Sequence, residues 1–422
     1  MFDLDRWQEI YETLRKNKMR TFLTAFGVFW GIFMLVVLMG AGNGLRNGVN
    51  NQMKGFATNS IFIWPQTTTI PYNGLPRGRN FSLNNDDVIA LRNNIPELEY
   101  LAPKLGGGDG GNSDNVTYGL KSGKFNISGD VPDWCKIDPV NIVYGRLLNE
   151  KDVTESRKVV VIGNRVQEVL FEKNENPVGK YIRIKGIWFQ VVGSFKPENQ
   201  SINIGGDKQQ SVFIPITTMQ RAYNYGQNIG FLALTTKKGN SAADVGDKVI
   251  AMLKRRHTVA PNDKDAIGHF NLEELFNQVS GLFMGINLLV WVVGTGTLLA
   301  GVIGISNIML VIVKERTKEI GIQRAIGAPP LVIMSQIITE SVVLTAIAGF
   351  VGLSLGVGLL SLINMALTSN GGEGGAPFKD PQVDFNMAIS ALVILIISGA
   401  FAGLLPALRA IKVRPIDALR YE

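Results

Sequence analysis

The sequence predicts an α-helical membrane protein with four transmembrane helices and a large extracytoplasmic α+β domain in two lobes. Four long segments are apolar and nearly uncharged, while Lys and Arg gather in short runs beside them, as a bilayer requires. Between the first and second of these segments lies a long polar stretch, in which apolar residues alternate instead of recurring with helical spacing.

The first apolar segment, Phe22 to Met39, has about the 18 residues that mark a transmembrane helix. A signal peptide would have a shorter apolar core and a small-residue cleavage site, so we expect a retained transmembrane helix at 21–42. Three more transmembrane helices are expected at 282–313, 331–367 and 387–408. The one at 331–367 is long enough to include an interfacial turn or a tilt.

The segment before the first transmembrane helix is amphipathic. Its apolar side chains recur at helical spacing and share one face: Leu4, Trp7, Tyr11 and Leu14. A basic cluster and a transmembrane helix follow directly, so residues 1–20 are expected to form a cytoplasmic amphipathic helix in the headgroup plane of the membrane.

The distribution of basic residues predicts the orientation in the membrane. Lys and Arg are frequent in the leader, in 314–324 and in the tail from Arg409 to Glu422, whereas the 368–386 connection holds Lys379 against three acidic residues. Because cytoplasmic loops carry the excess of basic residues, both termini are expected in the cytoplasm. The segment 43–281 is then an outer domain.

The outer domain is predicted to combine short strands with interleaved helices. Runs rich in β-branched and aromatic residues, bounded by Gly, Pro and Asn, predict strands at Ser60–Trp64, Lys158–Ile162, Tyr181–Ile184, Trp188–Val192, Val212–Ile216 and Phe231–Thr235. Helices are expected at Asp86–Asn94, Arg165–Phe171 and Ala242–His257. The stretch from about Lys124 to Ile216 is mainly β and is expected to form the second lobe. The run Gly106 to Gly111 lacks the Lys and Ser/Thr of a phosphate-binding loop, so a flexible turn is expected there.

The segment 314–330 is expected to be a cytoplasmic loop that contains a helix, from Glu315 to Ala328, with both signs of charge. Gly327 suits its C-terminal cap, and Pro329 and Pro330 end it and favour a new helix. A charge run of this kind is ordinarily a solvated connection. Here apolar residues, among them Ile320 and Ile326, stand between the charges, which indicates that one face docks onto another surface.

This loop resembles the cytoplasmic loop of the MacB/FtsX-type ABC transporter permeases, which reads ERTxEIGIRRAIGA. The match runs from Glu315 to Ala328, and Gln323 stands where the family usually has a basic residue. The resemblance extends to Asn17–Thr24, to the Val161–Gly193 region of the outer domain, and to the tail from Leu405 to Tyr421. It implies a MacB-like periplasmic core domain at 43–281 and an FtsX-like permease domain at 282–422, without the ATPase that MacB itself carries fused.

The resemblance implies a non-catalytic permease subunit of the bacterial inner membrane. Such a subunit couples cytoplasmic ATP hydrolysis by a separate ATPase subunit to periplasmic movement for export or efflux, the MacB-type mechanotransmission. The residues that it assigns to ATPase coupling are Glu315, Arg316, Glu319, Ile320, Arg324, Gly327 and Ala328. No GxxxxGK[ST] motif occurs in the sequence, so no directly bound cofactor is expected, and ATP is expected only through the ATPase partner. The other partners implied are a second permease copy in a homodimer or heterodimer, membrane lipids, a periplasmic adaptor and an outer-membrane channel.

Two related functions stay open from the sequence: an FtsX-like signalling permease that activates periplasmic cell-wall hydrolases, and a lipoprotein-releasing permease of the LolC/LolE type. The large outer domain favours an exporter over the signalling permease. Basic runs beside apolar segments account for much of the net charge of +7, so no nucleic acid is expected as a partner. A single cysteine, Cys135, and two histidines, His257 and His269, supply no evident metal site, and no catalytic constellation stands out.

Two polar residues, Asn307 and Glu340, lie inside apolar segments. An acidic residue in a membrane helix is a candidate functional site, although Glu340 is near enough to the start of its segment to lie at the interface. Glycines at near-helical spacing allow close approach of helices, either in a dimer seam or within one bundle: Gly294, Gly296, Gly301, Gly304, Gly352, Gly356, Gly399 and Gly403.

Overall fold

The computed structural model describes residues 18–53, 56–106, 113–198, 206–369, 378–381 and 385–412. The chain forms two compact units, one of residues 1–49 with 281–422 and one of residues 50–280, here named the helical bundle and the α+β domain. Most of the predicted amphipathic helix at 1–20, most of the Gly106–Gly111 run and the tail from residue 413 lie outside the described residues. The two units confirm the predicted fold class.

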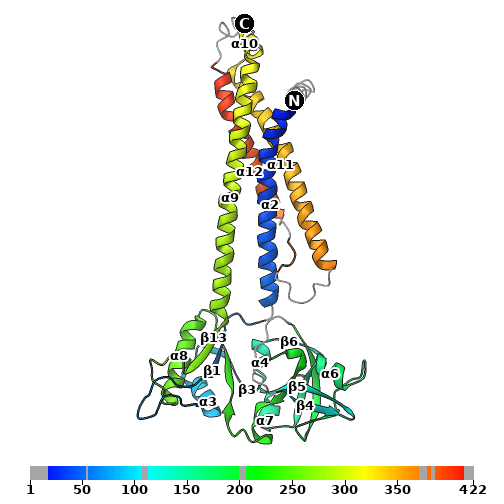
Figure 1. Cartoon of the computed structure of the whole chain (residues 1–422), viewed down its shortest axis with the longest axis vertical. Helices are drawn as coiled ribbons and strands as arrows, with labels where there is room; N and C mark the ends of the chain where they lie inside the picture. Colours follow the sequence, from blue (N-terminus) through cyan, green and yellow to red (C-terminus); the bar gives the residue numbers. More distant parts are fainter. Residues whose placement is uncertain are drawn as a thin grey trace. The chain divides into compact units, whose positions relative to one another are not determined.

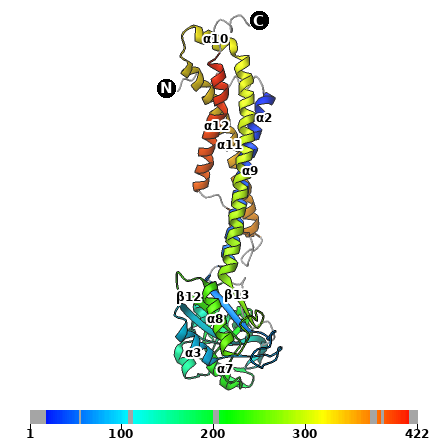
Figure 2. The ribbon, with the colours of Figure 1, turned by 90° about the vertical axis from the view of Figure 1, so that its left-hand side faces the viewer.

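The helical bundle contains five described helices, and four of them are long and apolar enough to cross a membrane. These four are α2 (Lys18–Met53), α9 (Leu272–Glu315), α11 (Pro330–Ser369) and α12 (Phe385–Ala410). They run lengthwise beside one another, and the short α10 (Thr317–Ala325) lies across one end of the bundle (Figures 1 and 2). The helix α11 is a single element, so the interfacial turn considered for this segment is absent from it.

The helix α9 begins at Leu272, earlier than the apolar pattern predicts. The side chain of Asn271 accepts hydrogen bonds from the backbone N–H groups of Glu273 at 3.0 Å and Glu274 at 3.3 Å. These contacts satisfy two of the N–H groups that a helix start leaves without an internal partner. The apolar segment predicted from the sequence covers only the part of the helix that can lie in lipid. The more polar first turns of the helix precede that segment.

Glycines let the helices of the bundle approach closely. A Cβ atom added at Gly352 of α11 would lie 2.7 Å from the backbone oxygen of Phe29 in α2, and one at Gly301 of α9 would lie 3.0 Å from Val28. The same crowding occurs at Gly294, Gly356, Gly399 and Gly403, each against another helix of this bundle. In contrast, Gly296 has open space around it, and so does Gly304. Packing within one bundle therefore explains six of the eight glycines.

The α+β domain is built on an eleven-stranded sheet (Figure 1). One part of it has the strand order β3-β12-β1-β13, with β1 (Ser60–Pro65), β3 (Leu98–Gly106), β12 (Phe231–Thr236) and β13 (Ile267–Asn271). Two helices, α3 (Asn85–Asn94) and α8 (Ala242–Arg256), pack against each other and against strands of this part. The short strands β2 (Leu83–Asn84) and β11 (Asn228–Ile229) pair with each other separately.

The second part of the sheet closes into a barrel. Its strand order is β10-β7-β9-β8-β4-β5, and β5 also pairs in parallel with β10. The strands are β4 (Ser113–Tyr118), β5 (Lys121–Asp130), β7 (Val159–Gly163), β8 (Tyr181–Ile184), β9 (Ile187–Pro197) and β10 (Ser211–Pro215), and β6 (Val140–Gly145) pairs with β9 outside this ring. The connections carry α4 (Trp134–Ile137), α5 (Glu150–Thr154), α6 (Asn164–Leu170), the 3₁₀ helix η1 (Lys208–Gln210) and α7 (Ile216–Ala222). Closure leaves no strand of the ring with an unpaired edge.

Strand β3 joins the two parts. Its residue Lys104 pairs with Phe231 of β12, and the next residue, Leu105, pairs with Gly129 of β5. At this joint the buried Lys104 ammonium lies 2.6 Å from the Asp130 carboxylate. The larger hydrophobic core contains residues of both parts, so the two lobes share one interior.

All six predicted strands and all three predicted helices of this domain are present, with boundaries shifted by a few residues. The sequence did not predict β2 to β6, β11, β13 or the short helices α4, α5 and α7. Strand β5, with the sequence KSGKFNISGD, shows why. It contains Gly and Lys, which are depleted in strands, and it is held by pairing with β3, β4 and β10 instead of by its own propensity.

Candidate functional site: the junction of α9, α10 and α11

The helix α10 is separated from α9 by a turn at Arg316. The hydroxyl of Thr317 donates to the carbonyl oxygens of Val313 and Lys314, at 3.1 Å and 2.7 Å. Where a single helix was expected from Glu315 to Ala328, the structure has the end of α9, this turn, and then α10. The direction of the chain changes here because the Arg316 backbone leaves helical geometry, with φ −90° and ψ 9°.

The end of α10 follows the predicted capping. Gly327 has φ +104°, a left-handed conformation that glycine adopts without steric cost. Its N–H donates to the carbonyl of Arg324 at 3.1 Å, and the N–H of Ala328 donates to the carbonyl of Gln323 at 3.0 Å. This hydrogen-bond pair is the Schellman motif, and α11 starts directly afterwards at Pro330. The position of α10 relative to α9 and α11 is thus fixed at both ends.

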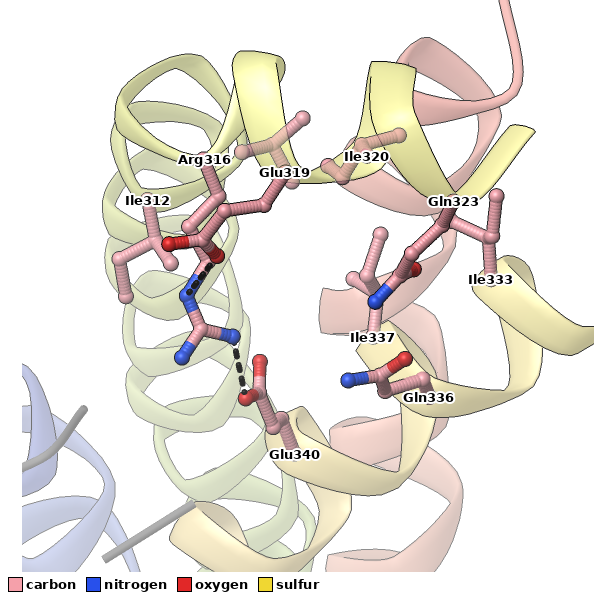
Figure 3. A pocket seen from close by; sticks show the side chains of 10 residues that line it. Ile312, Arg316, Glu319, Ile320, Gln323, Ile333, Gln336, Ile337 and Glu340 are labelled. Carbon is pink, nitrogen blue, oxygen red and sulfur yellow. Dashed lines mark hydrogen bonds and ion pairs between the residues drawn. The ribbon is translucent and has the colours of Figure 1, made fainter. Parts of the chain in front are cut away.

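One face of α10 packs onto the start of α11 (Figure 3). The side chains that α11 contributes follow helical spacing: Ile333, Gln336, Ile337 and Glu340. The side chains at α10 follow the same spacing: Arg316, Glu319, Ile320 and Gln323. They surround a small cavity of about 30 Å³. Ile320 is 7% exposed and Ile333 is 2% exposed, so the apolar part of this contact is well packed.

An ion pair closes the polar side of the cavity. The Arg316 guanidinium donates to the Glu340 carboxylate at 3.0 Å, and its Nε lies 3.8 Å from a carboxylate oxygen of Glu319 (Figure 3). The Glu340 side chain is 9% exposed and that of Arg316 is 21% exposed, whereas that of Glu319 is 66% exposed. A desolvated carboxylate in an apolar helix requires a cation, and Arg316 supplies it from the next element.

A second contact ties α10 to α12. The Arg324 guanidinium donates to the backbone carbonyl of Ile411, directly after the end of α12. The last carbonyls of a helix have no partner within the helix, so a guanidinium there satisfies one of them and favours the negative end of the helix dipole. Two arginines of the predicted coupling set therefore hold α10 onto its own bundle.

The opposite face of α10 is exposed. Ile326 is 82% exposed and Ile322 is 43% exposed, and Lys318 is exposed beside them. Glu319 and Gln323, at the rim of the cavity, are exposed as well. Glu315 and Gly327 are also exposed, and Ala328 is half-buried. The structure thus divides the predicted coupling residues into a set held against the bundle, with Arg316, Ile320 and Arg324, and an exposed set, with Glu315 and with Glu319 at the rim of the cavity.

Two polar residues of the site were not among the candidates from sequence. Gln336 and Gln323 line the cavity from facing helices. The spacing of Ile333, Gln336 and Glu340 on one helical face could have indicated their common environment, but not that α10 would cover them. The other intramembrane polar candidate, Asn307, is exposed on α9 and is not part of the cavity lining. Among the described residues, no group of three His, Cys, Asp or Glu side chains could hold a metal ion.

Four membrane-length helices, an α+β domain inserted after the first of them, and a charged helix α10 between the second and third define an ABC transporter permease. The family described as MacB-like periplasmic core domain matches residues 21–252, and the FtsX-like permease C-terminal family matches residues 291–415. The chain belongs to the MacB/FtsX-type permeases. The resemblance seen in the loop motif is therefore confirmed over most of the chain.

Curated relatives cover the chain almost completely. It is 28% identical over 415 residues to the macrolide export ATP-binding/permease protein MacB of Bdellovibrio bacteriovorus, a match that covers 98% of this chain and 61% of that protein. It is 28% identical over 424 residues to the pyoverdine export ATP-binding/permease protein PvdT of Pseudomonas savastanoi pv. phaseolicola, with 99% and 60% covered. The chain thus spans about three fifths of the length of these relatives. Among solved structures, the periplasmic region of MacB from Actinobacillus actinomycetemcomitans is 21% identical, with a TM-score of 0.43, and covers 54% of this chain and 95% of that one.

Proposed function

We propose that the chain is the permease subunit of an ABC exporter in the bacterial inner membrane. Both termini and α10 lie in the cytoplasm and the α+β domain lies in the periplasm, as the distribution of basic residues favours. The subunit transmits ATP-driven movement of a separate ATPase subunit to the periplasmic domain. The observation that carries the proposal is the two-sided α10, with one face fixed to the bundle and the other exposed.

The exposed face of α10 has the composition of a protein contact. Ile322 and Ile326 supply apolar area, and the neighbouring Glu319, at the rim of the cavity and 66% exposed, supplies a charge that can be paired across an interface. A groove of the ATPase that accepts these side chains would hold α10 at its outer face.

The inward contacts give such a docked helix a mechanical connection. Displacement of α10 acts on α9 through the chain itself, on α11 through Arg316 and Glu340, and on α12 through Arg324. Because α9 continues without a break to Leu272, movement at its cytoplasmic end is transmitted along 44 residues of helix. In the proposal, mechanotransmission means that displacement of α10 moves α9 along its length.

The proposed assembly contains two permease copies and an ATPase, and ATP acts through that ATPase. Export is the direction that the names of the curated relatives favour, since both describe exporters. An adaptor in the periplasm and a channel in the outer membrane complete the proposed route. No catalytic role is proposed for residues of this chain.

Copurification of the ATPase with variants of α10 tests the proposal. Glu319→Lys and Ile326→Asp each place a mismatched charge in the contact, and a change of this kind costs about 2–5 kcal/mol when the partner group is buried. We expect at least a tenfold loss of bound ATPase, together with loss of export, at normal expression. Lys379→Glu is the control, because this exposed residue lies on the connection between α11 and α12.

Arg324→Glu distinguishes the two faces of α10. It removes the contact to Ile411 inside the bundle, so we expect lower thermal stability of the isolated chain, which Glu319→Lys should leave unchanged. If Glu319→Lys and Ile326→Asp retain both the ATPase and export at the level of the parent chain, α10 is not the coupling element, and its charges are those of a solvated connection.

A further inference from the structure

A cleft in the α+β domain lies beside α8, far along the chain from α10. It encloses about 590 Å³ and is lined by α8 and by two loops, at 72–73 and 258–261. This volume is within the range of about 300–1,000 Å³ that is typical of small-molecule sites. The α8 helix packs one face on the sheet, with Val245, Val249 and Leu253 buried.

The other face of α8 forms the cleft wall. Asp247, Ile250, Ala251 and Lys254 recur at spacings of a helical face and all line it. The helix therefore has two distinct faces: one packs against the domain core, and the other lines the cleft. Figure 1 shows α8 beside β13 in this domain.

Buried polar groups hold the loop from Gln66 to Asn80, which carries Tyr72. The fully buried Asp263 carboxylate accepts hydrogen bonds from the Thr69 N–H at 2.7 Å, the Thr69 hydroxyl at 2.8 Å and the Ile70 N–H at 3.0 Å. Burial raises the pKa of Asp263, but these hydrogen bonds outweigh it and the pKa is lowered from its ordinary value. The loop is thus fastened by a charged acceptor and is not held by apolar packing alone.

The facing loop is fastened in the same way. The Arg79 guanidinium donates to the carbonyl oxygens of His257 at 2.6 Å and Thr258 at 2.9 Å, which joins the loop that carries Tyr72 to the end of α8. Asp87, which is 1% exposed, accepts from Arg256 at 2.6 Å and lies 2.7 Å from the His257 ring. The cleft is therefore formed before any ligand binds, and a preformed site binds without the entropy cost of ordering its walls.

The lining combines apolar area with positive charge. Ile250 and Pro261 give apolar surface, and the exposed Tyr72 ring adds an aromatic edge. Lys254 and Arg255 also line the cleft, against the single carboxylate of Asp247. Lysines and arginines at a helix C-terminus also interact favourably with the helix dipole. The dipole alone, however, does not explain why these residues line a cleft.

We propose that this cleft binds a small organic anion with an apolar, aromatic body. The body lies on the apolar surface against Tyr72, and the carboxylate pairs with Lys254 and Arg255, which can form charge-assisted hydrogen bonds to it. Asp247 opposes the ligand charge and so limits the affinity. The site does not depend on the ATPase or on the proposed role of α10.

The probe for this site is 4-benzoylbenzoate, an aromatic carboxylate that forms covalent bonds to nearby C–H groups under ultraviolet light. The full chain in detergent is irradiated with the probe, and the labelled peptides are identified by mass spectrometry. We expect saturable labelling of peptides from α8 and from the loop that carries Tyr72. The neutral analogue 4-methylbenzophenone should label them roughly tenfold less, since it lacks the charge-assisted contacts.

Two substitutions shift the labelling in opposite directions. Lys254→Glu should reduce it about tenfold, and Asp247→Asn should increase it severalfold because a repelling charge is removed. Lys173→Glu, the same charge change at an exposed site outside the cleft, is the control. The proposal is overturned if the neutral analogue labels α8 equally well, or if neither cleft substitution changes the labelling.

Discussion

The Arg316 guanidinium lies 3.0 Å from the Glu340 carboxylate, 24 positions further along the chain and on a different helix. In the sequence these residues belong to separate features, a charged loop and an acid within an apolar segment. In the structure they form one contact, which satisfies the acid and at the same time fixes α10. The candidate coupling element and the acidic residue of the apolar segment are therefore parts of one site.

The first prediction concerns the strength of this contact. Glu340→Ala leaves the partly buried Arg316 without its carboxylate, and we expect a loss of about 1–3 kcal/mol of unfolding free energy. The double variant Arg316→Ala/Glu340→Ala should be less destabilised than the sum of the two single variants, because neither charge is then left unpaired. Thermal unfolding of the four proteins in detergent gives the coupling energy.

Glu319→Ala is the matched control for this cycle. Glu319 also faces Arg316, but at 3.8 Å and with a largely exposed side chain. Exposed pairs contribute about 0–1 kcal/mol, so this substitution should change stability little. Equal effects of Glu319→Ala and Glu340→Ala would contradict the assignment of Glu340 as the buried anchor.

The second prediction tests the close contact between α2 and α11. Gly352→Ala places a methyl group 2.7 Å from the backbone oxygen of Phe29. A backbone atom cannot move aside as the end of a flexible side chain can. We expect a loss of about 1–3 kcal/mol, typical of overpacking. Gly358→Ala, on the same helix but with open space around it, should be neutral or slightly stabilising, since Ala favours helices. Similar melting temperatures for the two variants would count against this packing.

The third prediction concerns pH and the α+β domain. Burial raises the pKa of Asp87, but hydrogen bonds from His257, Arg256 and the Asn84 N–H outweigh it, and its pKa is lowered from the ordinary value of 3.8. A carboxyl with a lowered folded-state pKa stabilises the fold above its unfolded pKa and loses this contribution as the pH falls through its folded pKa. Asp87→Asn should therefore cost about 1–3 kcal/mol at pH 7 and less at pH 3, because the contribution of Asp87 falls progressively below its ordinary pKa of 3.8.

The comparison of variant and parent separates the contribution of Asp87 to the pH dependence of stability from the contributions of other carboxyl groups. Asp138, for example, has a raised pKa because of burial, which contributes in the opposite sense. Unfolding followed by tryptophan fluorescence at both pH values gives the difference for each protein. A difference that stays constant between pH 7 and pH 3 would show that Asp87 is not stabilised by these contacts.

The fourth prediction concerns topology. A reporter that is active only in the periplasm should be active when fused after Asn370 and inactive after Glu422, because basic residues favour the cytoplasmic side for the tail. A cytoplasmic reporter at the same two positions should give the reverse result. Activity of the periplasmic reporter after Glu422 would be incompatible with the proposed orientation.

Much of the fold could be predicted from local patterns in the sequence. The apolar segments indicated four membrane helices because the bilayer selects for continuous apolar length. Gly327 and Pro330 predicted where α10 ends and α11 begins, since both residues act through their own backbone geometry. Strands with clear β-branched runs, such as Val159–Gly163, were predicted for the same local reason.

Other features depended on contacts between distant segments. Strand β5 forms because three neighbours pair with it, and the barrel closes through its pairing with β10, which no local pattern encodes. The motif in the loop identified Arg316, Glu319 and Arg324 together, with no distinction between them. Only the tertiary structure shows that both arginines bind to the bundle while the Glu319 carboxylate stays largely exposed at the rim of the cavity, because helical spacing defines which residues share a face, and the positions of α11 and α12 decide how much of that face is covered.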